Sequence, residues 1–270
     1  MVISSSDITQ KTYKKLSIQV SLSGLSFCVF DLISNKILNT MSIDFEKNKV
    51  TEEQLWRTFV DYPILTKSYD EVMVVHDNNL NTFVPTSLFD ANFLASYLQY
   101  NTKVFETDFF TYDVVFPYEM NNIYVPFVNI NNFLLDQYET FEYQNANSIL
   151  VKQLLDLSKN KEEKQVFVHV QKEHFELIVV KNQQLILFNS FQYKTPEDFI
   201  YYILFTCEQL QLNPETILVQ ILGNCSEDDA CFKIAFQYIR NCSLLDVTSK
   251  ASILEVTPTA LRNHFILYHS

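Results

Sequence analysis

The sequence predicts an α/β protein in which one plan, three strands, a helix, a strand, a helix and a final strand (βββ-α-β-α-β), occurs twice. Two observations carry this prediction. Residues 16–43 and 166–191 each show three short strand-like runs separated by turn residues. A helix-start signature and then a short apolar strand follow each set. Matched elements in the same order indicate an internal duplication.

The first half begins with an antiparallel meander, whose strands we expect at 16–22, 26–33 and 37–43. The residues Thr51 and Gln54 have the spacing of a capping box, which predicts a helix that opens at Thr51. The remaining elements of this half are expected as a buried strand at 71–75, an extended segment at 81–84, a helix at 90–100 and a final strand at 103–106.

The second half repeats the plan, with strands expected at 166–170, 175–180 and 185–191. Thr195 and Asp198, with Pro196 at the first helical position, predict a helix that runs to Leu210. The elements expected after it are a buried strand at 216–222, an N-cap signature at 226–229, a helix that ends near 239 and a strand at 243–247.

Residues 107–164 connect the two halves. They contain a stretch rich in Tyr, Phe and Asn, a helix expected at 145–157 and a charged linker at 159–164. The predicted domains are therefore a first lobe at 1–106, the connection at 107–164 and a second lobe at 165–270.

The composition excludes several classes of protein. Apolar residues make up 47% and charged residues 19%, which argues against global disorder. The net charge of −12 argues against nucleic acid or an anionic membrane surface as a partner. No apolar run approaches the roughly 20 residues of a membrane span, so no membrane insertion is expected. The first twelve residues lack the apolar region of a signal peptide, and the five cysteines lack C-x-x-C spacing, so we expect reduced thiols and a cytoplasmic location.

Glycine is scarce in this chain. Only Gly24 and Gly223 occur in 270 residues, whereas an average usage near 7% would give roughly nineteen. Phosphate-binding loops rely on glycine because the backbone must approach the ligand closely or adopt a positive φ. The scarcity therefore disfavours a Walker loop or a dinucleotide fingerprint.

The duplicated plan resembles the actin-like ATPase superfamily, whose halves have the ribonuclease-H-like fold, and in particular its pilus-platform and cell-division branch. More closely, the chain resembles an uncharacterised Bacteroidota family, domain of unknown function 3822, which is grouped with those ATPases. The resemblance covers nearly the whole chain and implies a two-lobed actin-like fold. It is carried by architecture rather than by catalytic motifs.

The chain departs from that superfamily at the nucleotide motifs. Functional members carry Asp-x-Gly at the first hairpin turn of each half, where the corresponding residues here are 19–21 and 169–171, without Asp or Gly. The adenosine motif, a strand that ends in Gly-Gly, keeps one glycine at Gly223. The resemblance thus implies at most a vestigial nucleotide cleft, and no catalytic residue, cofactor or metal is expected. The residues of this cleft would be Ser21, Ser23, Gly24 and Gly223.

Two groups of titratable residues offer other candidates. His169 and His174, with Glu173, flank a turn, and His76 and Asp77 end the buried strand of the first half. The simpler interpretations are polar residues at a hairpin end and an asparagine-rich turn. An enzyme that uses either group is a further alternative.

The aromatic stretch at 109–141 is different in kind, because ten of its 33 residues are Phe or Tyr. One interpretation is packing of lobe against lobe, and the other is a surface for a protein partner or a second copy. We predict the interaction residues to be Phe116, Tyr118, Tyr124, Phe127 and Phe133.

These observations predict a non-catalytic actin-like protein that acts through protein contacts, as an assembly or regulatory adaptor. The alternative is a divergent nucleotide-binding member with weak or no hydrolysis.

Overall fold

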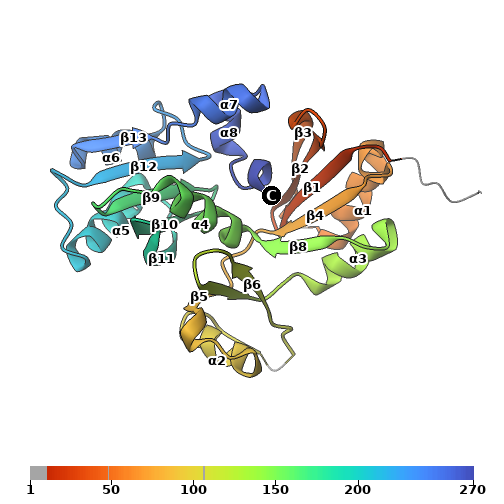
Figure 1. The fold of residues 1–270 in the computed structure, drawn as a ribbon, viewed down its shortest axis with the longest axis horizontal. Helices are drawn as coiled ribbons and strands as arrows, with labels where there is room; N and C mark the ends of the chain where they lie inside the picture. Colours follow the sequence, from red (N-terminus) through yellow and green to blue (C-terminus); the bar gives the residue numbers. More distant parts are fainter. Residues whose placement is uncertain (1–10, 48, 106) are drawn as a thin grey trace, which may run out of the picture. The chain divides into compact units, whose positions relative to one another are not determined.

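The computed structural model describes residues 11–47, 49–105 and 107–270 and has a mixed α/β architecture (Figure 1). The chain forms two compact units. One contains the residues up to His76 together with Phe127–Gln144, and the other contains Asp77–Pro126 together with Asn145–Ser270. These units do not coincide with the predicted lobes 1–106 and 165–270, because residues 77–126 cluster with the second sheet and residues 127–144 with the first.

The first unit is built on a five-stranded sheet with the order β3-β2-β1-β4-β8. The predicted meander is confirmed: β1 and β3 pair antiparallel with β2, and β4 pairs parallel with β1. The elements of this unit are β1 (Lys14–Ser21), β2 (Gly24–Asp31), β3 (Lys36–Asp44), α1 (Thr51–Asp61), η1 (Pro63–Thr66), β4 (Glu71–His76), α3 (Val128–Tyr138) and β8 (Glu142–Asn145, whose last residue belongs to the second unit).

The core of the first unit lies between this sheet and the helices α1 and α3. Leu16 and Ile18 of β1 share one hydrophobic cluster with Leu55 of α1 and Leu134 of α3, and all four are fully buried. The alternation of β1 explains this arrangement, because successive side chains of a strand point to opposite faces of the sheet.

The capping box predicted at Thr51 is wrong. The helix α1 does begin at Thr51, but its N-cap is Val50, which makes no side-chain cap hydrogen bond. The buried Gln54 side chain turns to the preceding loop instead, where it accepts from the Glu46 N–H at 2.6 Å and donates to the Lys49 carbonyl at 3.2 Å. Gln54 therefore ties the loop to the helix and leaves the helix start uncapped.

The second unit contains a matching sheet with the order β11-β10-β9-β12-β13. β10 pairs antiparallel with β9 and β11, and β12 pairs parallel with β9 and β13, so the duplicated plan is confirmed in both sheets. The elements are α4 (Ala146–Leu157), β9 (Gln165–Val170), β10 (His174–Lys181), β11 (Gln184–Gln192), α5 (Pro196–Gln209), β12 (Leu218–Gly223), α6 (Ala230–Tyr238), β13 (Asn241–Leu244), α7 (Thr248–Leu254), α8 (Pro258–Asn263) and η4 (Leu267–His269).

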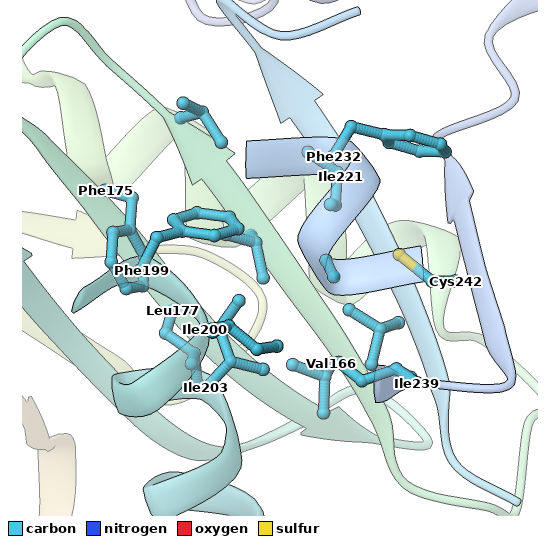
Figure 2. Packing of buried hydrophobic residues seen from close by; sticks show 14 of the residues in the cluster. Val166, Phe175, Leu177, Phe199, Ile200, Ile203, Ile221, Phe232, Ile239 and Cys242 are labelled. Carbon is cyan, nitrogen blue, oxygen red and sulfur yellow. The ribbon is translucent and has the colours of Figure 1, made fainter. Parts of the chain in front are cut away.

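Figure 2 shows how α5 and α6 pack on this sheet. Phe199 and Ile203 of α5 point toward Phe175 and Leu177 of β10, and the rings of Phe175 and Phe199 meet edge to face at 4.8 Å. β9 lies at the centre of the sheet, and all six of its residues are buried. A central strand of this kind must be apolar or have its polar groups paired.

The two helix starts predicted in the second half differ in outcome. At α5 the capping box is confirmed, since Thr195 Oγ1 accepts from the Asp198 N–H and the Asp198 carboxylate accepts from the Thr195 N–H. At α6 the start is three residues later than the signature at 226–229 predicts. Asp229 accepts from the Ser226 N–H and hydroxyl, so these residues form a turn before the helix.

A third sheet, β5-β7-β6, belongs to the second unit and was not predicted. The elements of this region are β5 (Asn81–Pro85), η2 (Thr86–Leu88), η3 (Ala91–Phe93), α2 (Leu94–Leu98), β6 (Thr111–Val115) and β7 (Met120–Tyr124). The helix expected at 90–100 is reduced to η3 and α2. The strand expected at 103–106 is absent from 103–105, and residue 106 lies outside the described residues. The fifth strand of the first sheet is β8, which lies in the predicted connection.

Several turns of the chain use residues other than glycine in the left-handed region of backbone space. Gly223 is joined there by nine non-glycine residues of the described chain: Tyr13, Asn35, Glu119, Glu139, Asn160, Asn182, Gln183, Gln211 and Glu255. Such a conformation costs an L-residue about 1–2 kcal/mol. The scarcity of glycine therefore appears in the structure as strained turns.

In the part of the chain that the structure describes, no helix combines the length and the apolar character needed to cross a membrane.

The contrast between the starts of α1 and α5 gives a stability prediction. Thr195→Ala removes a cap hydrogen bond and is expected to lower the free energy of unfolding by about 1 kcal/mol. Thr51→Ala removes no cap and should change it by less than about 0.5 kcal/mol. Chemical denaturation of both variants measures this, and an equal loss in the two would contradict the assignment of the caps.

Candidate functional site

The first three residues of the predicted cleft lie together at the β1–β2 turn. Ser21 Oγ accepts from the Ser23 N–H at 3.2 Å, donates to the Gly24 carbonyl at 3.2 Å and lies 3.1 Å from Ser23 Oγ. Both hydroxyls are thus engaged in closing their own turn. A Cβ on Gly24 would lie 2.6 Å from the Ile43 carbonyl oxygen, so the close approach of β3 accounts for this glycine.

Gly223, the fourth predicted cleft residue, ends β12 in the second unit. Its φ is +87°, and a Cβ there would lie 2.3 Å from the Val170 carbonyl oxygen. The same oxygen accepts from the Asn224 N–H at 2.7 Å, which fixes the end of β12 against β9. The exposed acidic residues Glu227, Asp228 and Asp229 follow this strand end, and their charge disfavours an anion there. Gly223 thus has a structural role in the sheet.

A buried cluster of two histidines and a glutamate lies on β9 and β10. His169 Nδ1 and Glu176 Oε2 are 2.8 Å apart, and His174 Nε2 lies 3.0 Å from Glu176 Oε1. Glu176 is 1% exposed. The sequence predicted a site of the two histidines with Glu173, whereas the carboxylate that lies between them is that of Glu176.

The electrostatics of this cluster favour a charged pair. Burial alone would raise the pKa of Glu176, but the hydrogen bonds from His169 and His174 outweigh it and lower the pKa to about 2. Burial opposes the charged form of His174, yet the hydrogen bond and charge of Glu176, with Asp77 and Glu173, raise its pKa. A signal was available in the sequence: a charged residue inside an apolar strand needs partners across the hairpin, and the register pairs 176 with 169.

His76, the other histidine candidate, is a core residue of the first unit. It is fully buried, its ring lies 5.6 Å from that of Phe127 and 5.5 Å from that of Tyr143, and its Nδ1 accepts from the Phe127 N–H at 3.3 Å. Burial lowers the pKa of His76 to about 4, so the ring is neutral at physiological pH. Asp77 accepts from the Gln171 side chain at 3.2 Å within the second unit.

The remaining nucleophile and ligand candidates are structural in character. All five cysteines are free thiols, and burial raises the pKa of Cys242 to about 11 and that of Cys225 to about 12, which keeps both protonated. In the described part of the chain, no three His, Cys, Asp or Glu side chains are arranged to hold a metal ion.

The five predicted interaction residues lie in different environments. Phe116 is 76% exposed, whereas Tyr124 is fully buried and donates from its hydroxyl to Asp113. Phe127 and Phe133 are half-buried against the core of the first unit. Tyr118 is half-buried, with its hydroxyl bound to Asp156 and accepting from Gln183 at 3.1 Å. Tyr124 was predicted to be an interaction residue, but its side chain is buried and is not accessible to a partner. Of the five residues, only Phe116 is largely accessible.

Tyr124 is held in a buried polar network that the sequence did not predict. Asp113 accepts from Tyr124, from the Asn145 N–H at 2.8 Å and from the Ser148 hydroxyl. Burial raises the pKa of Asp113 to about 6, although these hydrogen bonds lower it. Asn122 joins the network by donating to Ser148 Oγ at 2.9 Å. The network attaches β6 and β7 to the start of α4.

The strand β6 presents an apolar free edge. Among the strands that the structure describes, it pairs with β7 alone. The side chains of Tyr112 and Val114 are exposed, as is that of Phe116 directly after the strand. The Thr86 N–H bonds the Glu119 carbonyl, so the odd-numbered residues of β7 bond β5 and the even-numbered ones bond β6. Residues 111, 113 and 115 of β6 therefore pair with β7, while Tyr112 and Val114 direct their backbone groups to the free edge.

A family model described as "Protein of unknown function (DUF3822)" matches residues 3–242. The chain therefore belongs to this family. No curated protein matches its sequence.

Two solved structures support the fold. The first is a Bacteroides thetaiotaomicron protein described as having an actin-like ATPase fold and unknown function, with a TM-score of 0.81 and 21% identity over 92% of this chain and 98% of that one. The second is the PilM–PilN type IV pilus biogenesis complex, with a TM-score of 0.62 and 10% identity over 96% of this chain and 97% of that one. The chain has the actin-like ATPase fold, as the sequence predicted.

The contacts of Gly223 predict that only glycine is tolerated at this position. Gly223→Ala is expected to lower the free energy of unfolding by at least about 2 kcal/mol, because both the positive φ and the Val170 carbonyl oppose a Cβ. Ser23→Ala, at an exposed residue of the other predicted corner, should stay within about 0.5 kcal/mol. Urea denaturation of both variants checks this, and a neutral Gly223→Ala would show that the glycine is not required by the sheet.

The histidine–glutamate cluster predicts a change in titration. In Glu176→Gln the carboxylate is gone while burial remains, so the pKa of His174 should fall from above to below about 6.5. NMR of the histidine ring nitrogens against pH measures it. Glu173→Gln is the control and should change this pKa far less, since Glu173 is the weakest of the contributing groups. An unchanged pKa of His174 in Glu176→Gln would show that His174 does not pair with Glu176.

Proposed function

We propose that this chain acts through protein contacts, without catalysis, as an assembly or regulatory adaptor in the cytoplasm. The observation that carries the proposal is the free edge of β6, where Tyr112, Val114 and Phe116 expose apolar side chains beside unpaired backbone positions. Exposed strand edges with apolar side chains pair readily with another chain. A partner protein or a second copy would cover it.

Two further observations support this proposal. The hydroxyls and glycines of the predicted nucleotide corners are engaged in local backbone contacts. The PilM–PilN structure is a complex in which a protein of similar fold binds a partner.

The alternative, a divergent nucleotide binder, is favoured by the actin-like ATPase fold itself. A thermal-shift titration with Mg-ATP separates the two. A ligand at 100-fold above its Kd would stabilise the fold by about 2.7 kcal/mol, whereas the adaptor proposal expects no shift. A saturable stabilisation that Ser21→Ala weakens would overturn the proposal in favour of the alternative.

The adaptor proposal predicts loss of a partner when the β6 edge is changed. Val114→Pro removes an outward N–H without breaking the pairing with β7, and Phe116→Ser removes the largest exposed ring. With the double variant, we expect the amount of co-purified partner to fall at least tenfold. If the partner is a second copy, the fraction of dimer measured by light scattering should fall by the same factor. Cells that carry a tagged chain in place of the untagged one provide the material.

The matched control is Ile253→Ser on α7, since Ile253 and Val114 are each 64% exposed. It should retain the partner. Equal binding by the control and the double variant would count against the β6 edge.

A further inference from the structure

Two further strand edges of the second unit, those of β5 and β11, face a groove. One hollow of about 690 Å³ lies between β5 and β11, and a neighbouring hollow of about 640 Å³ shares Pro85, Met120, Leu185 and Ile186 with it. We call the two together the β5–β11 groove. β5 and β11, both labelled in Figure 1, are the outermost strands of their sheets. Hollows of this size lie within the range of ligand sites.

The β5 side of the groove offers unpaired backbone groups. The hydrogen bonds from Val125 N–H to the Leu80 carbonyl and from Thr86 N–H to the Glu119 carbonyl set the alternation of the β5–β7 ladder. Thr82 and Val84 therefore pair with β7, and Asn81 and Phe83 direct N–H and C=O away from it. Pro85 ends this edge, as is typical of an edge strand.

The β11 side offers a longer edge by the same argument. The Tyr193 N–H bonds the Glu173 carbonyl, so residues 187, 189 and 191 pair with β10. Phe188 and Ser190, both of which line the groove, turn their backbone groups outward. The Ser190 N–H donates to the side chain of the neighbouring Asn189, at 3.0 Å.

The walls of the groove are held in place before any ligand arrives. Asn81 donates to Asn122 Oδ1 at 2.9 Å and accepts from Asn147 at 3.0 Å, which anchors β5 in the buried polar network. The rings of Phe83 and Phe188 meet edge to face at 4.9 Å and join the two walls. A preformed site loses little ordering entropy on binding.

The charges along the groove are sparse and of one sign. Among the described residues, no charged side chain lines the larger hollow, and Glu119 is the one charged residue that lines the smaller one. The whole chain carries −12. This pattern suits a partner whose central residues are uncharged and which carries a Lys or Arg at the end that lies near Glu119.

We infer that the β5–β11 groove binds an extended, uncharged segment of a partner protein, which adds as a strand to the free edge of β11 and places a basic residue near Glu119. Strand addition suits an edge with outward backbone groups and a groove lined almost entirely by uncharged residues: main-chain hydrogen bonds supply affinity, and alternate side chains supply specificity. The site is separate from the β6 edge and does not depend on it.

A phage-displayed library of random 12-residue peptides, selected on the full chain, supplies probes, and fluorescence anisotropy of the labelled peptides measures their affinity. Ser190→Pro removes an outward N–H and leaves the β10–β11 ladder intact, so it should weaken the selected peptides at least tenfold. Ser190→Ala, which keeps the N–H, should bind within about twofold of the original chain. Glu119→Gln should weaken peptides with a basic end about threefold and reduce their salt dependence.

Two controls make the outcome decisive. Val114→Pro blocks the β6 edge and should leave peptide affinity unchanged, so failure of the adaptor proposal and failure of this inference are distinguishable. Hydrogen exchange with bound peptide should slow at the amides of Phe188 and Ser190 and not at Tyr112. The inference is overturned by a library that yields no binder weakened by Ser190→Pro, by protection at other strands, or by a dimer that Ser190→Pro dissociates, which would assign the groove to a second copy.

Discussion

The pairing of the buried Glu176 carboxylate with His169 is the interaction on which the register of the second sheet depends. Glu176 Oε2 lies 2.8 Å from His169 Nδ1 of β9, and a slip of one residue between β9 and β10 would take this partner away from the buried charge. His174 is on the same strand as Glu176 and would move with it. Of the described strands, β10 alone pairs with β11, and the register of β11 on β10 decides which residues of β11 turn outward. The pair His169–Glu176 thus holds β10 in register with β9, and β10 is the strand on which the edge strand β11 pairs.

The small sheet β5-β7-β6 is fixed by a related network, which joins amide side chains with one buried carboxylate, that of Asp113. Buried amides of Asn81, Asn122 and Asn147, together with Asp113, attach it to the start of α4 through directional hydrogen bonds. An apolar contact would tolerate sliding, whereas each buried amide loses about 1–3 kcal/mol if it is left unpaired. The orientation of both edges of this sheet is therefore specified. A sheet with two well-defined open edges is suited to contacts with other chains.

Local sequence patterns predicted the two meanders, α4 and the capped α5, because strand alternation and Thr195–Asp198 capping act over a few residues. They failed where a distant partner decides the outcome. β8, which lies in the predicted connection, is the fifth strand of the first sheet. Gln54 does not cap its helix, because its side chain binds the backbone of Glu46, eight residues earlier. Among site residues, Glu176 could have been found from its apolar neighbours. The buried role of Tyr124 could not, because it depends on Asp113 and on the packing of β7.

The strained turns have a counterpart in the unfolded chain. Residues with a Cβ explore fewer backbone states than glycine, and replacing a glycine by another residue removes unfolded-state entropy worth about 0.4–1 kcal/mol. With two glycines in 270 residues, the unfolded ensemble is narrower than that of an average chain. Nine left-handed non-glycine residues raise the energy of the folded state, while the same composition reduces the entropy lost on folding. The left-handed turns and the restricted unfolded ensemble thus act on the free energy of unfolding in opposite directions.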